Sequence, residues 1–178
     1  MSLLERSFSD HSLVTVSIHY YERDDYKVSR LAVRMDTCSL VVVITVPKPV
    51  EGLLVVSANA FIHLDQGPAG MGVAVNGYAP LATDFPLLNQ SHFDIALEGS
   101  EHVFLAPDQI LFTLRNGDMY LVELQQEGRS LSAFKIEKVG TGKQTSCKCS
   151  LGHGYFFVGS RYADTMLIKY STKDQVKA

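Results

Sequence analysis

The chain has 178 residues, of which 46% are hydrophobic and 20% are charged, a balance typical of a globular protein that buries a core. Its formal net charge of -3 argues against the strongly basic field with which proteins bind nucleic-acid phosphates unaided. No window approaches the roughly 18 to 20 apolar residues of a membrane span, and the first twelve residues lack a signal-peptide pattern. We therefore expect a soluble intracellular protein, with residues 1–10 flexible and no contact with a membrane.

The first strand patterns lie at residues 12–22 and 30–35 and predict an antiparallel pair. The turn between them is acidic. We interpret it as a solvated hairpin tip, and a partner contact or cation site is the less favoured alternative. The candidate contact residues in this tip are Glu22, Asp24 and Asp25.

Three later segments share one pattern of strand, short turn and strand. They are residues 52–65, 109–124 and 154–170. Leu53, Ile110 and Tyr155 are equivalent positions in these hairpins and lie 57 and 45 residues apart, the longer interval containing a Gly/Pro-rich insert. A period near 45 residues is the size of one β-propeller blade.

The second hairpin, QILFTLRNGDMYLVEL, has apolar residues on both sides of its turn. Asn116-Gly117 predicts a two-residue type I′ turn, because both central positions of that turn need a positive φ. Such a turn would pair Leu114 with Met119. The two faces expected from this register are Phe112, Leu114, Met119 and Leu121, and Leu111, Tyr120 and Val122. Neither face is polar, so we expect this sheet to lie between two others.

Further strand patterns complete units of four strands, each roughly 40 to 50 residues long. They are residues 38–46, 92–98, 101–107, 129–140 and 145–152. Helix patterns are almost absent. The predicted fold class is all-β, a WD40-like β-propeller segment of about three to four antiparallel blades. Because closed propellers need about four to eight blades, we interpret residues 1–178 as a partial propeller.

Motifs for catalysis or nucleotide binding are incomplete. Residues 140–145, GTGKQT, resemble a phosphate loop, but Glu137 stands where the first glycine is required and Gln144 where a magnesium-binding Ser or Thr is required. No G-x-S-x-G elbow presents a serine nucleophile. We therefore expect no enzyme activity, no catalytic residue and no cofactor.

The cysteines are interpreted as reduced thiols, because three is an odd number and no secretory signal precedes them. They are Cys38, Cys147 and Cys149. Cys147 and Cys149 with His153 offer zinc-type ligands, but zinc usually recruits four ligands at characteristic spacings, so we interpret both cysteines as packing residues. The six histidines show no ligand spacing either, and we expect no metal site.

Residues 155–171, YFFVGSRYADTMLIKYS, resemble the hairpin G-S-R-x-x-[D/N]-[S/T]-x-L-x-K that ends a first-propeller blade in one family of large triple-propeller proteins. That family includes the largest subunit of the cleavage and polyadenylation specificity factor, the large damaged-DNA-binding subunit and a splicing-factor scaffold. The matching residues, which we interpret as turn chemistry, are Gly159, Ser160, Arg161, Asp164 and Thr165.

Other stretches resemble the cleavage and polyadenylation branch in particular, and the resemblance covers about residues 31 to 170. They are RLAVRMDTCSLVVV, VPKPVEGLLVVSANAFIHLDQ, GVAVNGYA, FPLLNQSHFDIALEG and RSLSAFKIEKVG. In that family additional strands separate DTCS from VPKP, whereas here the two are joined directly. We therefore expect later blades of a first propeller, with one blade incomplete near Val43 to Val46.

The resemblance implies a nuclear, non-catalytic scaffold of mRNA 3′-end processing, which organises the subunits that recognise the polyadenylation signal. Its expected partners are the other subunits of that complex, and pre-mRNA would be contacted mostly indirectly. The alternatives are a direct RNA-binding propeller module, the equivalent segment of a splicing or DNA-damage scaffold, and an enzyme.

A partial propeller has two open ends, and we predict that the isolated chain self-associates or aggregates. Burying several hundred Å2 of apolar blade face, at about 25 cal/mol per Å2, offers several kcal/mol or more before ordering costs. The expected contacts are the strands at residues 12–21 and 165–171. Sedimentation over a wide concentration range is the measurement, and a folded monomer at every concentration would contradict the prediction.

Overall fold

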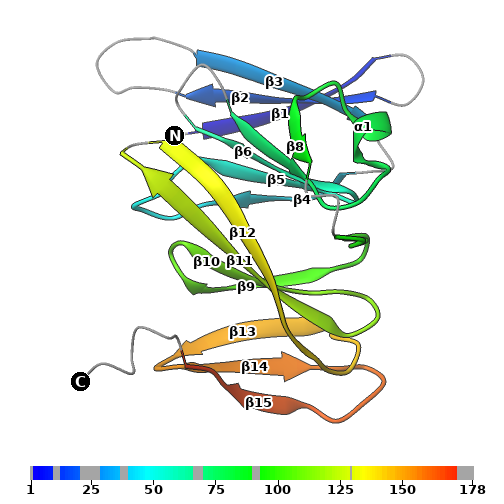
Figure 1. Cartoon of the computed structure of the whole chain (residues 1–178), viewed down its shortest axis with the longest axis vertical. Helices are drawn as coiled ribbons and strands as arrows, with labels where there is room; N and C mark the ends of the chain where they lie inside the picture. Colours follow the sequence, from blue (N-terminus) through cyan, green and yellow to red (C-terminus); the bar gives the residue numbers. More distant parts are fainter. Residues whose placement is uncertain are drawn as a thin grey trace. The chain divides into compact units, whose positions relative to one another are not determined.

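The computed structural model describes residues 2–9, 13–20, 29–36, 40–65, 70–89, 93–128 and 130–171, with side chains from residue 41 onward (Figure 1). The chain divides into two compact units. The first is residues 1–98 with 126–132, and the second is residues 99–125 with 133–178. Within the described ranges the strands form four sheets, and the all-β propeller-blade organisation predicted from the sequence is confirmed.

The first sheet of the first unit has three antiparallel strands in the order β1-β2-β3. They are β1 (Ser2–Ser9), β2 (Leu13–Tyr20) and β3 (Ser29–Asp36). The predicted pair is β2 with β3. Residues 2–9 pair with β2 along their whole length, whereas the sequence suggested a flexible segment over residues 1–10. The acidic tip with Glu22, Asp24 and Asp25 lies outside the described residues.

The second sheet has five strands in chain order. They are β4 (Leu40–Thr45), β5 (Leu53–Ser57), β6 (Ala60–Leu64), β7 (Met71–Ala74) and β8 (Leu87–Asn89). Every residue of β5 and β6 is buried, which explains their continuous apolar runs. The segment interpreted as an insert supplies β7 and the short helix α1 (Ala79–Ala82), and β8 pairs with β7 in parallel. Among the described residues, no helix combines the length and apolar character needed to cross a membrane.

The strand predicted at residues 92–98 is wrong. Residues 93–97 form no regular element, although Ile95 and Leu97 are buried as the alternation suggested. Their N–H groups donate to single carbonyls, Ile95 to Val75 O at 3.0 Å and Leu97 to Ala58 O at 2.8 Å. The apolar residues at alternate positions are therefore buried, but their backbone N–H groups bond to loop carbonyls and not to a neighbouring strand.

The second unit contains a four-stranded sheet in the order β12-β11-β10-β9 and a three-stranded sheet in the order β13-β14-β15. The strands are β9 (Glu101–Ala106), β10 (Gln109–Thr113), β11 (Asp118–Glu127), β12 (Ser130–Thr141), β13 (Cys147–Gly152), β14 (Tyr155–Gly159) and β15 (Met166–Lys169). The far ends of β11 and β12, residues 126–132, group with the first unit. Each of the three predicted hairpins supplies the second and third strands of its sheet, which confirms the repeat.

The turn of the β10–β11 hairpin differs from the prediction by one residue. Leu114 N–H donates to Asp118 O at 2.8 Å, so the loop has three residues, and only Gly117, at φ 90°, has a positive φ. Asn116 instead accepts the Asp118 N–H on its side-chain oxygen at 2.9 Å. A turn followed by a left-handed glycine is the usual form of a three-residue hairpin loop, so the type I′ assignment is wrong.

The longer loop changes the strand register and moves side chains between faces. Thr113 lies opposite Met119, and Met119 shares a face with Leu111 and not with Leu114. Both faces nevertheless remain buried. One holds Ile110, Phe112, Leu114 and Val122, and the other holds Leu111, Thr113 and Met119. The inference that this sheet is covered on both sides is therefore unaffected by the error in register.

Two glycines approach each other where the β10–β11 turn meets the chain after β12. Gly142 N–H donates to Gly117 O at 2.8 Å, and a Cβ added to Gly117 would strike the carbonyl oxygen of Gly142. A Cβ on Gly142 would come within 2.5 Å of the Met119 Cε atom. The close approach therefore requires glycine for space as well as for φ.

Lys148 of β13 joins the two sheets of the second unit. Its Nζ donates to Glu101 O and Thr113 Oγ1, both at 2.7 Å, and lies 3.5 Å from Leu111 O. The three oxygens match the three N–H donors of the ammonium group, but none of the three oxygens carries a charge. Burial lowers the pKa of Lys148 to about 7, and the nearby Glu101 carboxylate opposes that shift.

We predict that Gly117→Val lowers the free energy of unfolding by at least about 2 kcal/mol, because it combines positive-φ strain with the clash against Gly142. Gly128→Val is the matched control, since Gly128 has φ 69° but no atom within 4 Å of an added Cβ. Urea melts of both variants measure the difference. Equal losses in the two variants would mean that the contact with Gly142 contributes nothing.

We predict that the stability of the protein rises between pH 7 and pH 9 because of Lys148. Its pKa is lower in the folded state than the usual 10.5, so the unfolded state binds more protons in this window. The gain is up to about 3 kcal/mol, since each pH unit is worth about 1.4 kcal/mol. Lys148→Met should remove this slope from thermal melts, and Lys143→Met, at an exposed lysine, should leave it in place. An unchanged slope in Lys148→Met would contradict the prediction.

Candidate partner-binding slot

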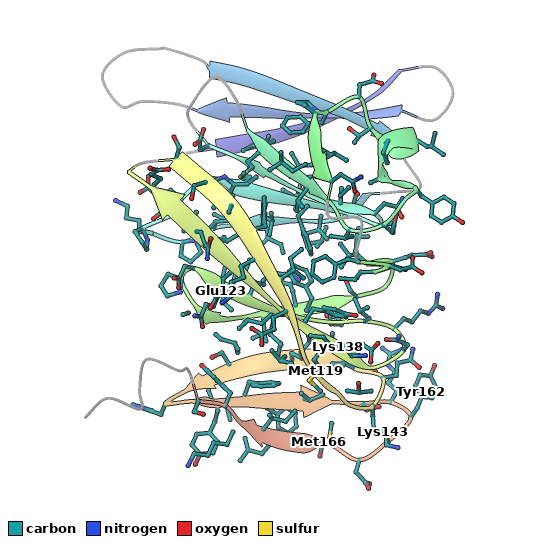
Figure 2. All side chains as sticks on the ribbon, viewed as in Figure 1. Met119, Glu123, Lys138, Lys143, Tyr162 and Met166 are labelled. Carbon is teal, nitrogen blue, oxygen red and sulfur yellow. The ribbon has the colours of Figure 1, made fainter. Side chains whose placement is uncertain are left out.

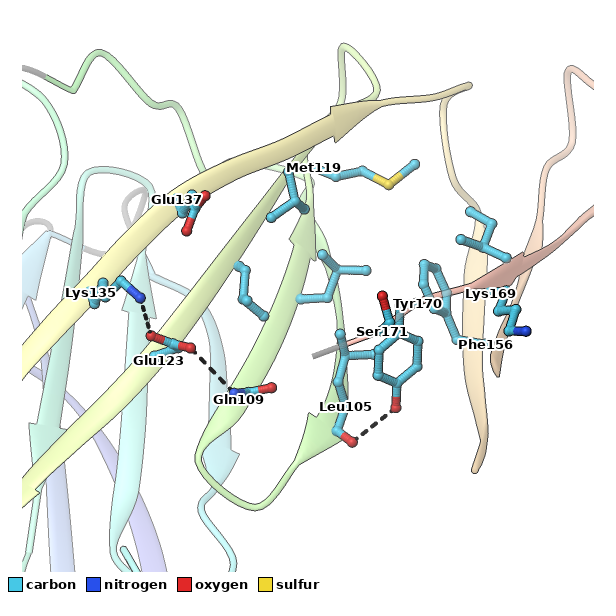
Figure 3. Close-up of a pocket in the computed structure, with 14 residues that line it drawn as sticks. Leu105, Gln109, Met119, Glu123, Lys135, Glu137, Phe156, Lys169, Tyr170 and Ser171 are labelled. Carbon is cyan, nitrogen blue, oxygen red and sulfur yellow. Dashed lines mark hydrogen bonds and ion pairs between the residues drawn. The ribbon is translucent and has the colours of Figure 1, made fainter. Parts of the chain in front are cut away.

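A cavity of about 580 Å3 lies between the two sheets of the second unit (Figure 3). Its volume is within the range of ligand-sized pockets. Three neighbouring strands contribute alternate residues, so one face of the four-stranded sheet forms the floor. The floor residues are Gln109 and Leu111 of β10, Met119, Leu121 and Glu123 of β11, and Lys135, Glu137 and Val139 of β12. We call this cavity the slot.

Within the described residues, a four-stranded sheet faces a three-stranded sheet, and the slot lies between them. β13 packs on β9, and Phe156 and Val158 of β14 pack on Val103 and Leu111. Met166 of β15 packs against the same cluster, which includes Met119 of β11 (Figure 2). The described strands of the smaller sheet therefore pack on β9, β10 and β11. The open space lies over the β12 residues named above.

Polar groups converge at one side of the slot. Lys135 Nζ lies 2.7 Å from Glu123 Oε2, and Gln109 Nε2 donates to Glu123 Oε1 at 3.3 Å (Figure 3). Gln109 Oε1 is buried and has no hydrogen-bond partner among the described residues. No sequence motif marks these residues. The one sequence signal for them is the alternation along β12. Phe134 and Ile136 are buried, so the residues between them face the other way, and that pattern alone predicts a solvent-exposed face.

The opposite wall of the slot is the outer edge of β15, which is the last strand of its sheet within the described residues. Tyr170 N–H donates to Gly154 O at 2.8 Å, toward the neighbouring β14. Because successive residues of a strand point their backbone groups to opposite sides, Leu167, Lys169 and Ser171 direct theirs away from β14. Four consecutive residues, 168–171, line the slot. At one end, Tyr170 O–H donates to Leu105 O at 3.1 Å and its ring lies 5.9 Å from that of Phe156.

The sheet β13–β15 also has an exposed apolar face on its other side. Cys149, Phe157 and Leu167 lie directly opposite one another across the three strands, and we call them the outward face. Leu167 is 62% exposed and Phe157 is 37% exposed. Lys169 and Tyr155 are on the same side, with the ammonium group 5.8 Å from the ring centre. Lys169 thus turns its charge away from the slot.

The five turn residues that match the family hairpin lie at the β14–β15 connection, and none lines the slot. Ser160 Oγ accepts the Tyr162 N–H at 3.2 Å. Gly159 O accepts the Ser146 N–H at 2.8 Å, and a Cβ on Gly159 would come 2.6 Å from the Cys147 sulfur. The side chains of the remaining three, Arg161, Asp164 and Thr165, are exposed. Tyr162 and Lys143 project from loops at this end of the unit (Figure 2).

Cys147 and Cys149 are free, exposed thiols, so their interpretation as packing residues is wrong. Two residues apart on β13, they lie on the same face, and that is the outward face, which no described segment of this unit covers. His153 is in the β13–β14 turn at φ 51°. Cys38 lies outside the described residues. Within the described ranges, no group of three or more His, Cys, Asp or Glu residues is arranged to hold a metal ion.

Among the described residues, two histidines are buried or half-buried. His63 is 2% exposed and its Nε2 lies 2.7 Å from Glu51 O, an arrangement in which burial lowers its pKa despite that hydrogen bond. His102 stacks 6.0 Å from Phe112, and burial together with the charge of Lys148 lowers its pKa. Both imidazoles are thus held toward the neutral form, and neither belongs to the slot.

An ion pair stabilises the hairpin turn. Lys138 Nζ lies 2.8 Å from Asp118 Oδ1, which also accepts the Thr141 hydroxyl at 2.8 Å. The hydrogen bond from Lys138 lowers the pKa of Asp118, and the same bond raises the pKa of Lys138. Lys138 is exposed and Asp118 is partly exposed, so we interpret the pair as local turn chemistry.

Comparison with known proteins gives the family of the chain. A family model described as the RSE1/DDB1/CPSF1 first β-propeller matches residues 2–177. Cleavage and polyadenylation specificity factor subunit 1 of Drosophila melanogaster is 31% identical over 172 residues, which cover 82% of this chain and 12% of that protein.

Further relatives agree. Protein CFT1 of Coccidioides immitis is 34% identical over 142 residues, covering 75% of this chain and 10% of the relative. Cleavage and polyadenylation specificity factor subunit 1 of Arabidopsis thaliana is 30% identical over 130 residues, covering 73% and 9%. The chain thus spans about a tenth of the length of these relatives. It belongs to the RSE1/DDB1/CPSF1 first β-propeller family, and within that family it is a segment of a first propeller of the subunit 1 type.

Proposed function

We propose that the chain is a non-catalytic scaffold segment of the nuclear mRNA 3′-end cleavage and polyadenylation machinery, organising subunits that recognise the polyadenylation signal. Family membership supports a role in this machinery. The relatives reported above include two subunits named for cleavage and polyadenylation, which favours this branch over the splicing and DNA-damage branches.

The observation that carries the scaffold role is the outward face of β13–β15. Cys149, Phe157 and Leu167 present sulfur, aromatic and aliphatic atoms to water from directly opposed positions. Contiguous exposed apolar surface of this kind is typical of protein interaction sites. A binder of single-stranded RNA would instead combine a basic groove with stacked aromatic side chains, and the chain carries a formal net charge of -3. The same face supports the proposal that isolated chains associate with one another.

Co-purification tests the proposal. We expect the affinity-tagged chain to recover subunits of the cleavage and polyadenylation complex from nuclear extract, detected by immunoblot. The double variant Phe157→Ser and Leu167→Ser should reduce that recovery at least about tenfold, because it removes the exposed apolar contacts. Leu81→Ser is the matched control, since Leu81 of α1 is 86% exposed in the first unit and should leave recovery unchanged. Recovery of no subunit by the folded, unsubstituted chain would contradict the scaffold role.

An RNA titration separates the scaffold from the RNA-binding alternative. Binding of a labelled single-stranded RNA that is tight at low salt and falls steeply as salt rises would favour direct RNA binding, because phosphate contacts release counterions. The scaffold role predicts no saturable binding at physiological salt.

A further inference from the structure

We propose that the loops at one end of the second unit bind an acidic peptide segment of a partner protein, through the cationic side chains of Arg115, Lys143 and Arg161. We call this surface the basic end. The proposal deepens the scaffold role, on which it rests, by assigning one surface and one class of partner. The basic end is separate from the slot and from the outward face, because it is formed by connections between strands and not by the edge or face of a sheet.

The three cations extend from three successive connections. Arg115 is in the β10–β11 turn, Lys143 is in the β12–β13 connection and Arg161 is in the β14–β15 connection. All three are exposed, and none belongs to an ion pair within the part of the chain that the structure describes. Like charges on one surface repel one another, so an anion that lies among them relieves that repulsion.

Hydrogen bonds of the backbone fix the three connections beside one another. Gly142 N–H donates to Gly117 O at 2.8 Å, which joins the β12–β13 connection to the β10–β11 turn. Ser146 Oγ accepts the Arg161 N–H at 3.0 Å, which joins the same connection to the β14–β15 connection. The segment that carries Lys143 is therefore bonded to both of its neighbours, and the three cations share one surface.

Nearby carboxylates do not cancel this positive charge. Asp118 is already paired with Lys138 at 2.8 Å. Glu101, at the start of β9, lies close enough to the Lys148 ammonium group to raise its pKa against the effect of burial. Asp164 is the one carboxylate that belongs to the three connections themselves. Three cations and one carboxylate leave the basic end with an excess of positive charge, although the whole chain is acidic.

The segment GTGKQT does not form the phosphate loop that its sequence resembles. It connects two strands, whereas a phosphate loop leads from a strand into a helix and cradles phosphate with backbone N–H groups. The N–H of Gly142 is bonded to Gly117 O and is not available to a phosphate. What the segment presents to a ligand is therefore the side chain of Lys143.

The chemistry of the basic end favours a peptide over RNA. The planar guanidinium groups of arginine bind carboxylates through two parallel hydrogen bonds. Tyr162 follows Arg161, is 78% exposed and projects at the same end of the unit as Lys143 (Figure 2). Tyrosine and arginine are enriched in protein interfaces, whereas a site for single-stranded RNA stacks successive bases on several aromatic side chains. Tyr162 is the one aromatic residue of the three connections. The fitting peptide thus carries Asp or Glu on both sides of an apolar residue.

The test uses the purified 178-residue chain and a fluorescein-labelled peptide, Gly-Asp-Glu-Leu-Asp-Glu-Gly, in fluorescence anisotropy. We expect saturable binding that weakens as the salt concentration rises, because exposed charges are screened. The control peptide Gly-Asn-Gln-Leu-Asn-Gln-Gly has the same length and the same apolar residue but no carboxylate side chain. It should bind at least about tenfold more weakly.

Single substitutions in the protein provide the reciprocal test. Lys143→Glu and Arg161→Glu each reverse one charge and retain the backbone N–H, and each should weaken binding at least about fivefold. Lys169→Glu is the matched control, because it makes the same change of sign at an exposed lysine that faces Tyr155 at the opposite end of the β14–β15 hairpin. It should bind like the unsubstituted chain. Melting curves verify that each variant is folded.

Four results would overturn the assignment. The first two are the absence of saturable binding by the unsubstituted chain and equal binding of the acidic and amide peptides. The third is an equal loss in Lys169→Glu and Arg161→Glu, which would mean that the peptide responds to the charge of the whole chain. The fourth is tighter binding of a labelled hexauridylate than of the acidic peptide at the same salt concentration, which would make RNA the occupant.

Failure of this proposal is distinguishable from failure of the scaffold role. Loss of peptide binding with intact co-purification would remove only the basic end, because the outward face is tested by substitutions at Phe157 and Leu167. A chain that binds the acidic peptide but recovers no subunit from nuclear extract would remove the scaffold role and leave the basic end as a peptide site.

Discussion

The structure depends on one constraint, that the inner strands of its sheets are apolar on both faces and must be covered twice. β5 and β6 contain no exposed residue, and the β10–β11 hairpin buries Ile110 and Phe112 on one face and Leu111 and Met119 on the other. Such strands cannot form a sheet with one face in water. Within the described part of the second unit, the slot and the outward face are the places that this requirement leaves without a covering strand.

The sequence was sufficient for features that depend on local pattern. The three hairpins, the β2–β3 pair and the all-β class follow from turn residues and apolar alternation, which act over a few neighbouring residues. The register of the β10–β11 hairpin did not follow, because Asn116-Gly117 is compatible with a two-residue or a three-residue loop. Hydrogen bonding of Asp118 to the Asn116 side chain selects the longer one. Likewise, the parallel pairing of β8 with β7 depends on a chain excursion that no local pattern encodes.

The candidate site was less accessible to sequence reasoning than the fold. Glu123, Lys135 and Glu137 alternate with buried residues and have the pattern of a solvated strand face. They line a cavity because the sheet β13–β15 packs over β9, β10 and β11, an arrangement set by strands that come later in the chain. Lys148, between two exposed cysteines, reads as a surface lysine until folding brings the carbonyl of Glu101 and the hydroxyl of Thr113 to it.

The burial of Lys148 also alters the charge that the molecule presents in an electric field. The formal value of -3 counts every lysine as a full cation, but a pKa of about 7 leaves this one with roughly half a charge at neutral pH. The folded chain should therefore migrate toward the anode slightly faster than its composition implies. The excess mobility should grow between pH 7 and pH 9, and it should vanish in a denaturing gel, where the amine regains its ordinary basicity.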